Sequence, residues 1–109
     1  MHKLWAEQSN TNTMKQQVFN EMLSKVCDLF EIEKDELLSK TKNREAVDAR
    51  HMLYYLCRKR PMRLTSIQSF LSKEGFDTAH SAIHHGINRV EIKVNTDKDY
   101  RRVVKELSS

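Results

Sequence analysis

Glycine and proline are scarce in this sequence of 109 residues, which contains 2 and 1 of them respectively. So few turn-forming residues favour helices over short strands joined by tight turns. Two glycines also exclude the G-x-x-x-x-G-K-S/T and G-x-G-x-x-G motifs, whose loops hold the phosphates of nucleotides. No apolar run approaches the roughly 18 residues of a membrane span, and residues 1–7 lack a signal-peptide core. We therefore expect neither a nucleotide nor a membrane as a partner.

Cysteine is also rare, and the two cysteines, Cys27 and Cys57, form no C-x-x-C motif. Each falls within an apolar helical pattern, which is typical of reduced core thiols in a cytosolic protein. The sequence therefore predicts a cytoplasmic protein without disulfides.

Charge is unevenly distributed along the chain, whose formal net charge is +4. Residues 28–36 carry five acidic side chains and one lysine, whereas residues 40–63 carry eight basic and two acidic side chains. The net charge of residues 40–63, here called the basic segment, is therefore larger than the net charge of the whole chain. Such clustering indicates a face that binds a polyanion, although a solvated helix surface would explain the charge alone equally well.

The spacing of apolar residues predicts an all-α fold, a compact bundle of about six helices. A brief helix containing Leu37 and Leu38 is expected with Asp35 as its N-cap, and Thr96 with Asp99 forms a capping-box-like start of the last helix. Five longer helices with an apolar period of 3.6 residues are expected at residues 14–30, 45–58, 64–74, 79–92 and 96–107.

Residues 14–109 are expected to form one domain, since a chain of this length can bury a single core. The polar residues 1–13 are interpreted as a disordered or weakly ordered tail. Trp5, beside Leu4 in this tail, either docks on a protein partner or folds back onto the core.

The helices expected on either side of Gly75 have the layout of a helix-turn-helix. Gly75 fits the left-handed position after the first helix, and Asp77 or Thr78 is expected to cap the second. In this motif the second helix places its N-terminal residues in the major groove of DNA, where short polar groups reach bases and phosphates. The residues there are Thr78, His80, Ser81, His84 and His85. The pattern alone also fits a plain helical bundle.

Four stretches resemble the C-terminal DNA-binding domain of the bacterial replication initiator DnaA. They read VCDLFEI (residues 26–32), LLSKTKNR (37–44), ARHM (49–52) and AHSAIHHGI (79–87). The resemblance extends over roughly residues 18–107. It implies a helical bundle of the Trp-repressor and DnaA type, whose helix-turn-helix binds short sites in double-stranded DNA at replication origins, without catalysis or a cofactor in this domain.

The resemblance also implies roles for individual residues. Lys42 falls where the family has a basic residue that reaches into the minor groove; because lysine lacks the planar fork of arginine, a simple phosphate contact is an equal alternative. His80 with Ser81 matches a pair that touches bases in the major groove. The full set of expected DNA contacts is Lys42, Arg44, Arg50, Arg58, Thr65, His80, Ser81, His84 and His85. Of these, the arginines would clamp phosphates, Thr65 would lie near another base contact, and His85 would lie close to the phosphates. For Arg50 an alternative is that its stem packs while its head pairs with an acid.

Several positions depart from the pattern of the family. Lys42 replaces an arginine, Ala79 an aspartate and Ala82 a threonine, and the segment 72–79 is longer. We therefore expect a target site different from the usual one of the family. The ATPase domain is not part of this sequence, so we interpret the chain as a stand-alone version that binds DNA without ATPase activity. A phage origin, with location in the host cytoplasm or the virion, is a further hypothesis.

Two other interpretations stay open. His80 and His84 have the i, i+4 spacing of zinc ligands, but Ser81 replaces the glutamate of the H-E-x-x-H motif, so a metal site is not expected. The alternative function is a helical structural or interaction module, for example a protein on a phage particle that binds DNA or protein without sequence preference. Protonation of His84 would strengthen DNA binding below about pH 6.5.

Overall fold

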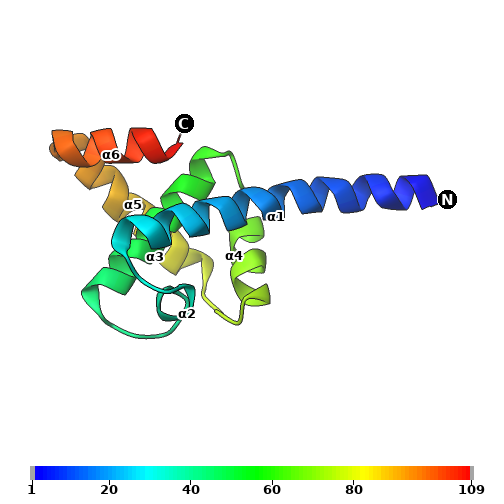
Figure 1. Cartoon of the computed structure of the whole chain (residues 1–109), viewed down its shortest axis with the longest axis horizontal. Helices are drawn as coiled ribbons and strands as arrows, with labels where there is room; N and C mark the ends of the chain where they lie inside the picture. Colours follow the sequence, from blue (N-terminus) through cyan, green and yellow to red (C-terminus); the bar gives the residue numbers. More distant parts are fainter. Residues whose placement is uncertain (1, 109) are drawn as a thin grey trace.

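The computed structural model describes the backbone of residues 2–108 and the side chains of residues 14–108. Within this part of the chain all regular structure is helical (Figure 1). The helices are α1 (His2–Phe30), α2 (Lys34–Leu37), α3 (Arg44–Lys59), α4 (Leu64–Lys73), α5 (His80–Thr96) and α6 (Lys98–Ser108). The predicted all-α fold is therefore confirmed. The expectations for the side chains of residues 1–13, including Trp5, lie outside the described residues.

Helix α3 is the centre of the fold, because it contacts each of the other five helices (Figure 1). Its residues 52–57 are six consecutive buried residues, so the helix is enclosed on nearly all sides. Around it, α1 contributes Met22 and Val26, α4 contributes Ile67, and α5 contributes Ile83, all at most 2% exposed. Each such side chain stabilises the fold by about 1.5–3 kcal/mol through removal of apolar surface from water.

The two cysteines are free thiols, as predicted. Cys57 on α3 is buried, and this burial raises the pKa of its thiol to about 12. Cys27 on α1 is half-buried, and its pKa is raised mainly by burial and also by Asp28. Both thiols are therefore protonated at neutral pH, which suits a packing role.

Helices α3 and α5 approach closely at Gly86. A Cβ atom at this position would lie 2.7 Å from Cδ2 of His51 and 2.8 Å from Cδ2 of Tyr54. Real Cβ atoms do not come so close to other carbon atoms without displacing them. Glycine at this point therefore sets the distance between the central helix and α5.

The predicted caps of α2 and α6 are wrong. Helix α2 begins at Lys34, so Asp35 lies within its first turn and is not its N-cap. Before α6, the carboxylate of Asp97 accepts hydrogen bonds from the backbone N–H groups of Asp99 and Tyr100, at 2.9 and 3.2 Å. Thr96 instead donates its hydroxyl to the carbonyl of Ile92, because α5 continues four residues further than its apolar pattern predicts.

The turn between α4 and α5 confirms the left-handed glycine and corrects the predicted cap. Gly75 has φ +88°, and the N–H of Phe76 bonds the carbonyl of Leu71 at 2.9 Å, which is the Schellman ending of α4. The N-cap of α5 is Ala79, without a side-chain hydrogen bond, so neither Asp77 nor Thr78 caps the helix. The Asp77 carboxylate instead accepts from the hydroxyl of Ser72 at 3.1 Å, because the turn folds back onto the end of α4.

Candidate nucleic-acid interface

Helix α5 has an inner face and an outer face. Ile83, Gly86, Ile87 and Val90 are buried against the rest of the domain. The outer face begins at the N-terminus of the helix with exposed His80, Ser81, His84 and His85, all of which are expected DNA contacts. Backbone N–H groups at the start of a helix attract anions, so this end suits both bases and phosphates.

The start of α4 lies beside the start of α5. The side-chain amide of Gln68 donates to the carbonyl oxygen of Thr78 at 2.8 Å, and Thr65 and Thr78 line the same shallow hollow. Thr65 is exposed there. The structure therefore brings Thr65 next to the turn that precedes His80, as a helix-turn-helix requires.

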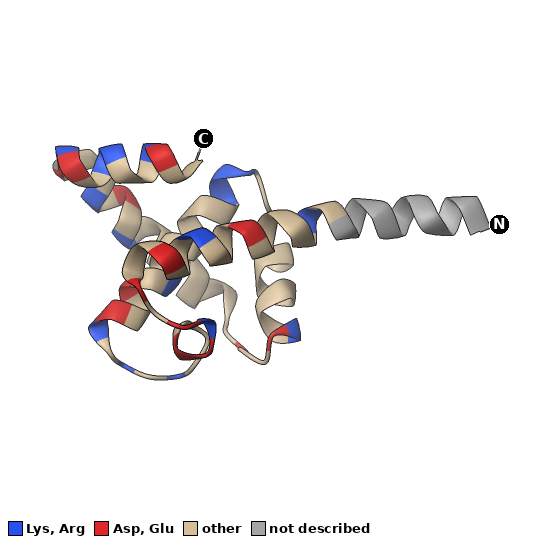
Figure 2. Ribbon diagram, in the orientation of Figure 1, with Lys and Arg blue, Asp and Glu red and all other residues tan. Residues whose placement is uncertain are grey.

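The segment 38–43, here called the basic loop, lies against the same turn. Its Lys40 donates a hydrogen bond to the carbonyl oxygen of Asp77 and stands 4.4 Å from the centroid of the Phe76 ring. Lys42, two residues further, is exposed, and so is Arg44 in the first turn of α3. In Figure 2, blue segments mark basic residues along the loop between α2 and α3. Lys42 is thus carried by the loop that touches the turn before α5, and Arg44 follows this loop at the start of α3.

Arg50 faces inward, in contrast to the expectation that it clamps a phosphate. Its side chain is buried, and its guanidinium donates to the carbonyl oxygens of Leu37, Ser39 and Thr41 at 2.9, 2.6 and 2.9 Å. Burial lowers its pKa from the ordinary value. Of the alternative, the packing of the stem fits this burial, whereas the acceptors of the guanidinium are backbone carbonyls and not an acid. Arg50 therefore holds the basic loop in place and has little surface left for DNA.

Arg58 lies at the other end of α3 from Arg44. Fourteen residues of helix separate the two by about 21 Å along the axis. Arg58 is exposed beside Lys59 and Arg60, and one of its N–H groups bonds the carbonyl of Met62 at 3.2 Å. The structure therefore does not bring Arg58 together with the cations of the basic loop. It would contact a different stretch of phosphates.

The histidines of α5 form no metal centre in the described structure. No group of three or more His, Cys, Asp or Glu side chains among the described residues could hold a metal ion. His85 instead stands edge-on to the ring of His51 on α3, with 6.0 Å between the ring centroids. Burial first, and then the nearby His85, lower the pKa of His51.

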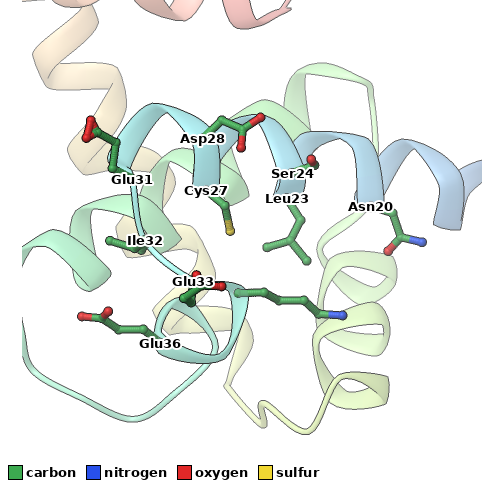
Figure 3. A pocket seen from close by; sticks show the side chains of 10 residues that line it. Asn20, Leu23, Ser24, Cys27, Asp28, Glu31, Ile32, Glu33 and Glu36 are labelled. Atoms are coloured by element: carbon green, nitrogen blue, oxygen red, sulfur yellow. The ribbon is translucent and has the colours of Figure 1, made fainter.

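The acidic segment, residues 28–36, lines a separate hollow between α1 and α2. Its walls include Asp28, Glu31, Glu33 and Glu36 (Figure 3). No lining residue comes from α4, α5 or the basic loop. Lys34, the one cation there, pairs with Glu74 at 2.7 Å, and this contact raises the pKa of Lys34. A surface of this charge repels phosphates, so DNA is expected on the side of α5 and the basic loop.

Sequence reasoning missed three residues of this region. Lys40 and Phe76 join the basic loop to the turn, and this tertiary contact leaves no local pattern in the sequence. Arg89 is exposed on α5, four residues after His85 and eight after Ser81. That helical spacing could have placed Arg89 on the outer face beforehand.

A helix-turn-helix with an exposed polar second helix beside a basic loop defines a class, the helix-turn-helix DNA-binding domains. A family model described as bacterial dnaA protein helix-turn-helix matches residues 19–90, which is more than half of the chain. The chain therefore belongs to this family, and the resemblance seen in the sequence is confirmed. The match ends within α5 and leaves α6 outside.

Curated proteins and solved structures gave no significant match. No helix in the described part of the chain is long and apolar enough to cross a membrane.

Proposed function

We propose that this protein binds double-stranded DNA at preferred sequences, and that it acts in the initiation of replication, in its control, or in the regulation of transcription. The observation that carries the proposal is the outer face of α5. There, the exposed side chains of His80, Ser81, His84 and His85 lie at the start of a helix whose preceding turn contacts a basic loop.

In this arrangement the start of α5 and the exposed cations outside it have different roles. His80 and Ser81 read base edges in the major groove, where short donors and acceptors distinguish the base pairs. The exposed methyl groups of Ala79 and Ala82 suit contact with the methyl group of thymine. Lys42, Arg44 and Arg58 bind phosphates, and release of counterions makes the affinity depend steeply on salt. Nucleotide hydrolysis plays no part, since these residues include no phosphate-binding glycine loop.

Selection from a library of random duplexes tests the proposal directly. We expect one motif to be enriched and to bind about 10³-fold or more tightly than random duplex. Absence of an enriched motif, together with negligible duplex affinity at about 100 mM salt, would contradict the proposal. Salt-sensitive binding without an enriched motif would instead support a module that binds DNA without sequence preference.

Two variants then separate the roles. His80→Ala is expected to cost about 1–3 kcal/mol on the selected site and little on random duplex, because it removes a base contact. Lys42→Ala is expected to weaken both duplexes and to reduce the slope of log K against log salt by about 0.9. Lys105→Ala, which removes an exposed cation on α6, is the control and should leave both affinities and the salt slope unchanged. Equal losses on random duplex for His80→Ala and Lys42→Ala would contradict the assigned roles.

A further inference from the structure

Phe76 lies where the two proposed DNA-contacting parts of the molecule meet. Its side chain is 5% exposed, although Gly75 and Asp77 on either side of it are exposed. Its backbone N–H closes the Schellman ending of α4, and four residues later α5 begins at His80. The ring is therefore fixed relative to the start of α5.

Two cations, one from the basic loop and one from α3, face this ring. Lys40 Nζ, from the basic loop, lies 4.4 Å from the ring centroid, and Arg50 Cζ, from α3, lies 5.3 Å from it. Both distances are within the range of about 6 Å in which a cation is attracted to the face of an aromatic ring. Lys40 also donates to the Asp77 carbonyl, so its ammonium contacts the turn at two neighbouring residues.

Arg50 extends the contact to the rest of the basic loop. The same guanidinium that faces Phe76 holds the carbonyl groups of Ser39 and Thr41 on either side of Lys40. Residues 40–43 belong to no helix, so side-chain contacts of this kind have to fix their path. The contacts thus run from the turn that precedes α5, through Phe76 and Asp77, to the segment that presents Lys42.

We propose that Phe76 is a positioning residue, which fixes the basic loop against the start of α5 so that Lys42 and the outer face of α5 meet DNA in one register. The inference deepens the proposed function and rests on it. The physical gain is pre-organisation, because a loop that is already ordered loses less conformational freedom when DNA binds.

Three substitutions distinguish positioning from packing. Phe76→Leu keeps an apolar side chain in place but removes the ring face that attracts Lys40 and Arg50. Phe76→Tyr keeps the ring and is the rescue variant. Phe70→Leu is the matched control, because Phe70 is 6% exposed in the same motif but packs on Phe19, with 5.5 Å between the ring centroids, and does not face the basic loop.

The first measurement uses the free protein and needs no DNA. Protons on the Lys40 ε-carbon above an aromatic ring resonate upfield, so NMR reports the contact directly. We expect this upfield shift in the wild type and in Phe76→Tyr and Phe70→Leu, and its loss in Phe76→Leu. The rate of tryptic cleavage after Lys40 and Lys42 is expected to rise about tenfold in Phe76→Leu only, which is the effect of losing cation–π contacts worth roughly 1–2 kcal/mol.

The second measurement is the affinity for the selected duplex, expected to fall about tenfold in Phe76→Leu and to return in Phe76→Tyr. An unchanged Lys40 shift and cleavage rate in Phe76→Leu would overturn the inference, and so would an equal loss of affinity in Phe70→Leu. If the wild type binds no duplex, the proposed function fails, while the NMR shift and the cleavage rate still decide whether Phe76 orders the loop.

Discussion

The inner and outer sides of residues 40–50 use positive charge in different ways. On the inner side, Arg50 is 8% exposed and bonds three backbone carbonyls. On the outer side, Lys42 and Arg44 are exposed. A buried cation whose donors are satisfied fixes the chain, whereas an exposed one is available to a phosphate. The number of cations in a segment therefore overstates the number that are free to bind a phosphate.

Arg50→Ala should give the largest effect and tests the comparison most severely. It leaves buried carbonyls without donors, so we expect the free energy of unfolding to fall by about 3 kcal/mol in urea denaturation. Lys42→Ala, the matched control on the outer side, should change it by less than about 0.5 kcal/mol. An Arg50→Ala variant of normal stability but with a reduced salt slope of DNA binding would place Arg50 on the outer side.

Gly86→Ala tests the inner face of α5, and an exposed residue of the same helix serves as its control. The added methyl group would meet the rings of His51 and Tyr54 at 2.7 and 2.8 Å. Overpacking costs about 1–3 kcal/mol, and the better helix propensity of alanine returns up to about 1 kcal/mol. We expect a net loss of about 1–2 kcal/mol in thermal or urea unfolding. Asn88→Ala, exposed on the same helix, should be neutral, and equal stability of the two variants would show that the close approach at Gly86 is unimportant.

Glu31→Gly tests whether backbone strain or charge repulsion matters in the acidic segment. Glu31 has φ +54°, a left-handed conformation that a side chain disfavours, and it follows the end of α1. Glycine there should raise the free energy of unfolding by about 0.5–1 kcal/mol. Glu33→Gly removes the same charge at a residue with φ −76°, so it should not stabilise the protein. A gain of the same size in both variants would mean that charge repulsion, and not backbone strain, is relieved.

The smallest expected effect is on the pH dependence of stability, and it distinguishes His51, packed between α3 and α5, from His84 on the outer face of α5. His51 faces His85 on α5, with Asp48, Arg50 and Lys93 nearby, and its pKa is lowered mainly by burial. The unfolded chain therefore binds more protons, so the free energy of unfolding should fall as the pH drops through about 6.5. His51→Gln should weaken this dependence in urea titrations at about pH 7.5 and 5.5. His84→Gln, on the outer face, should keep it; a similar loss in that variant would contradict the assignment to His51.

Much of the fold could be predicted from local patterns. The apolar spacing located α3 to α6 and the part of α1 that follows residue 13, and Gly75 marked the left-handed end of α4; the extension of α1 back to His2 was not predicted. The predictions of Asp35, Thr96 and Asp77 as caps were wrong. Several polar residues lie at each helix boundary, and which of them bonds the free backbone N–H groups depends on where the helix begins. Gly86 also carried no local signal, since its role depends on the rings of α3 that lie against it.

For the candidate site, the sequence by itself determined the family, the helix-turn-helix and the polar outer face of α5, because these follow from residue order and helical period. Only the tertiary structure decided which cations of the basic segment face outward. Arg44 and Arg50 are six residues apart on the same helix, and one is exposed while the other is buried. Composition cannot distinguish them, because the carbonyl oxygens that hold Arg50 and the ring of Phe76 come from segments that only folding brings beside it.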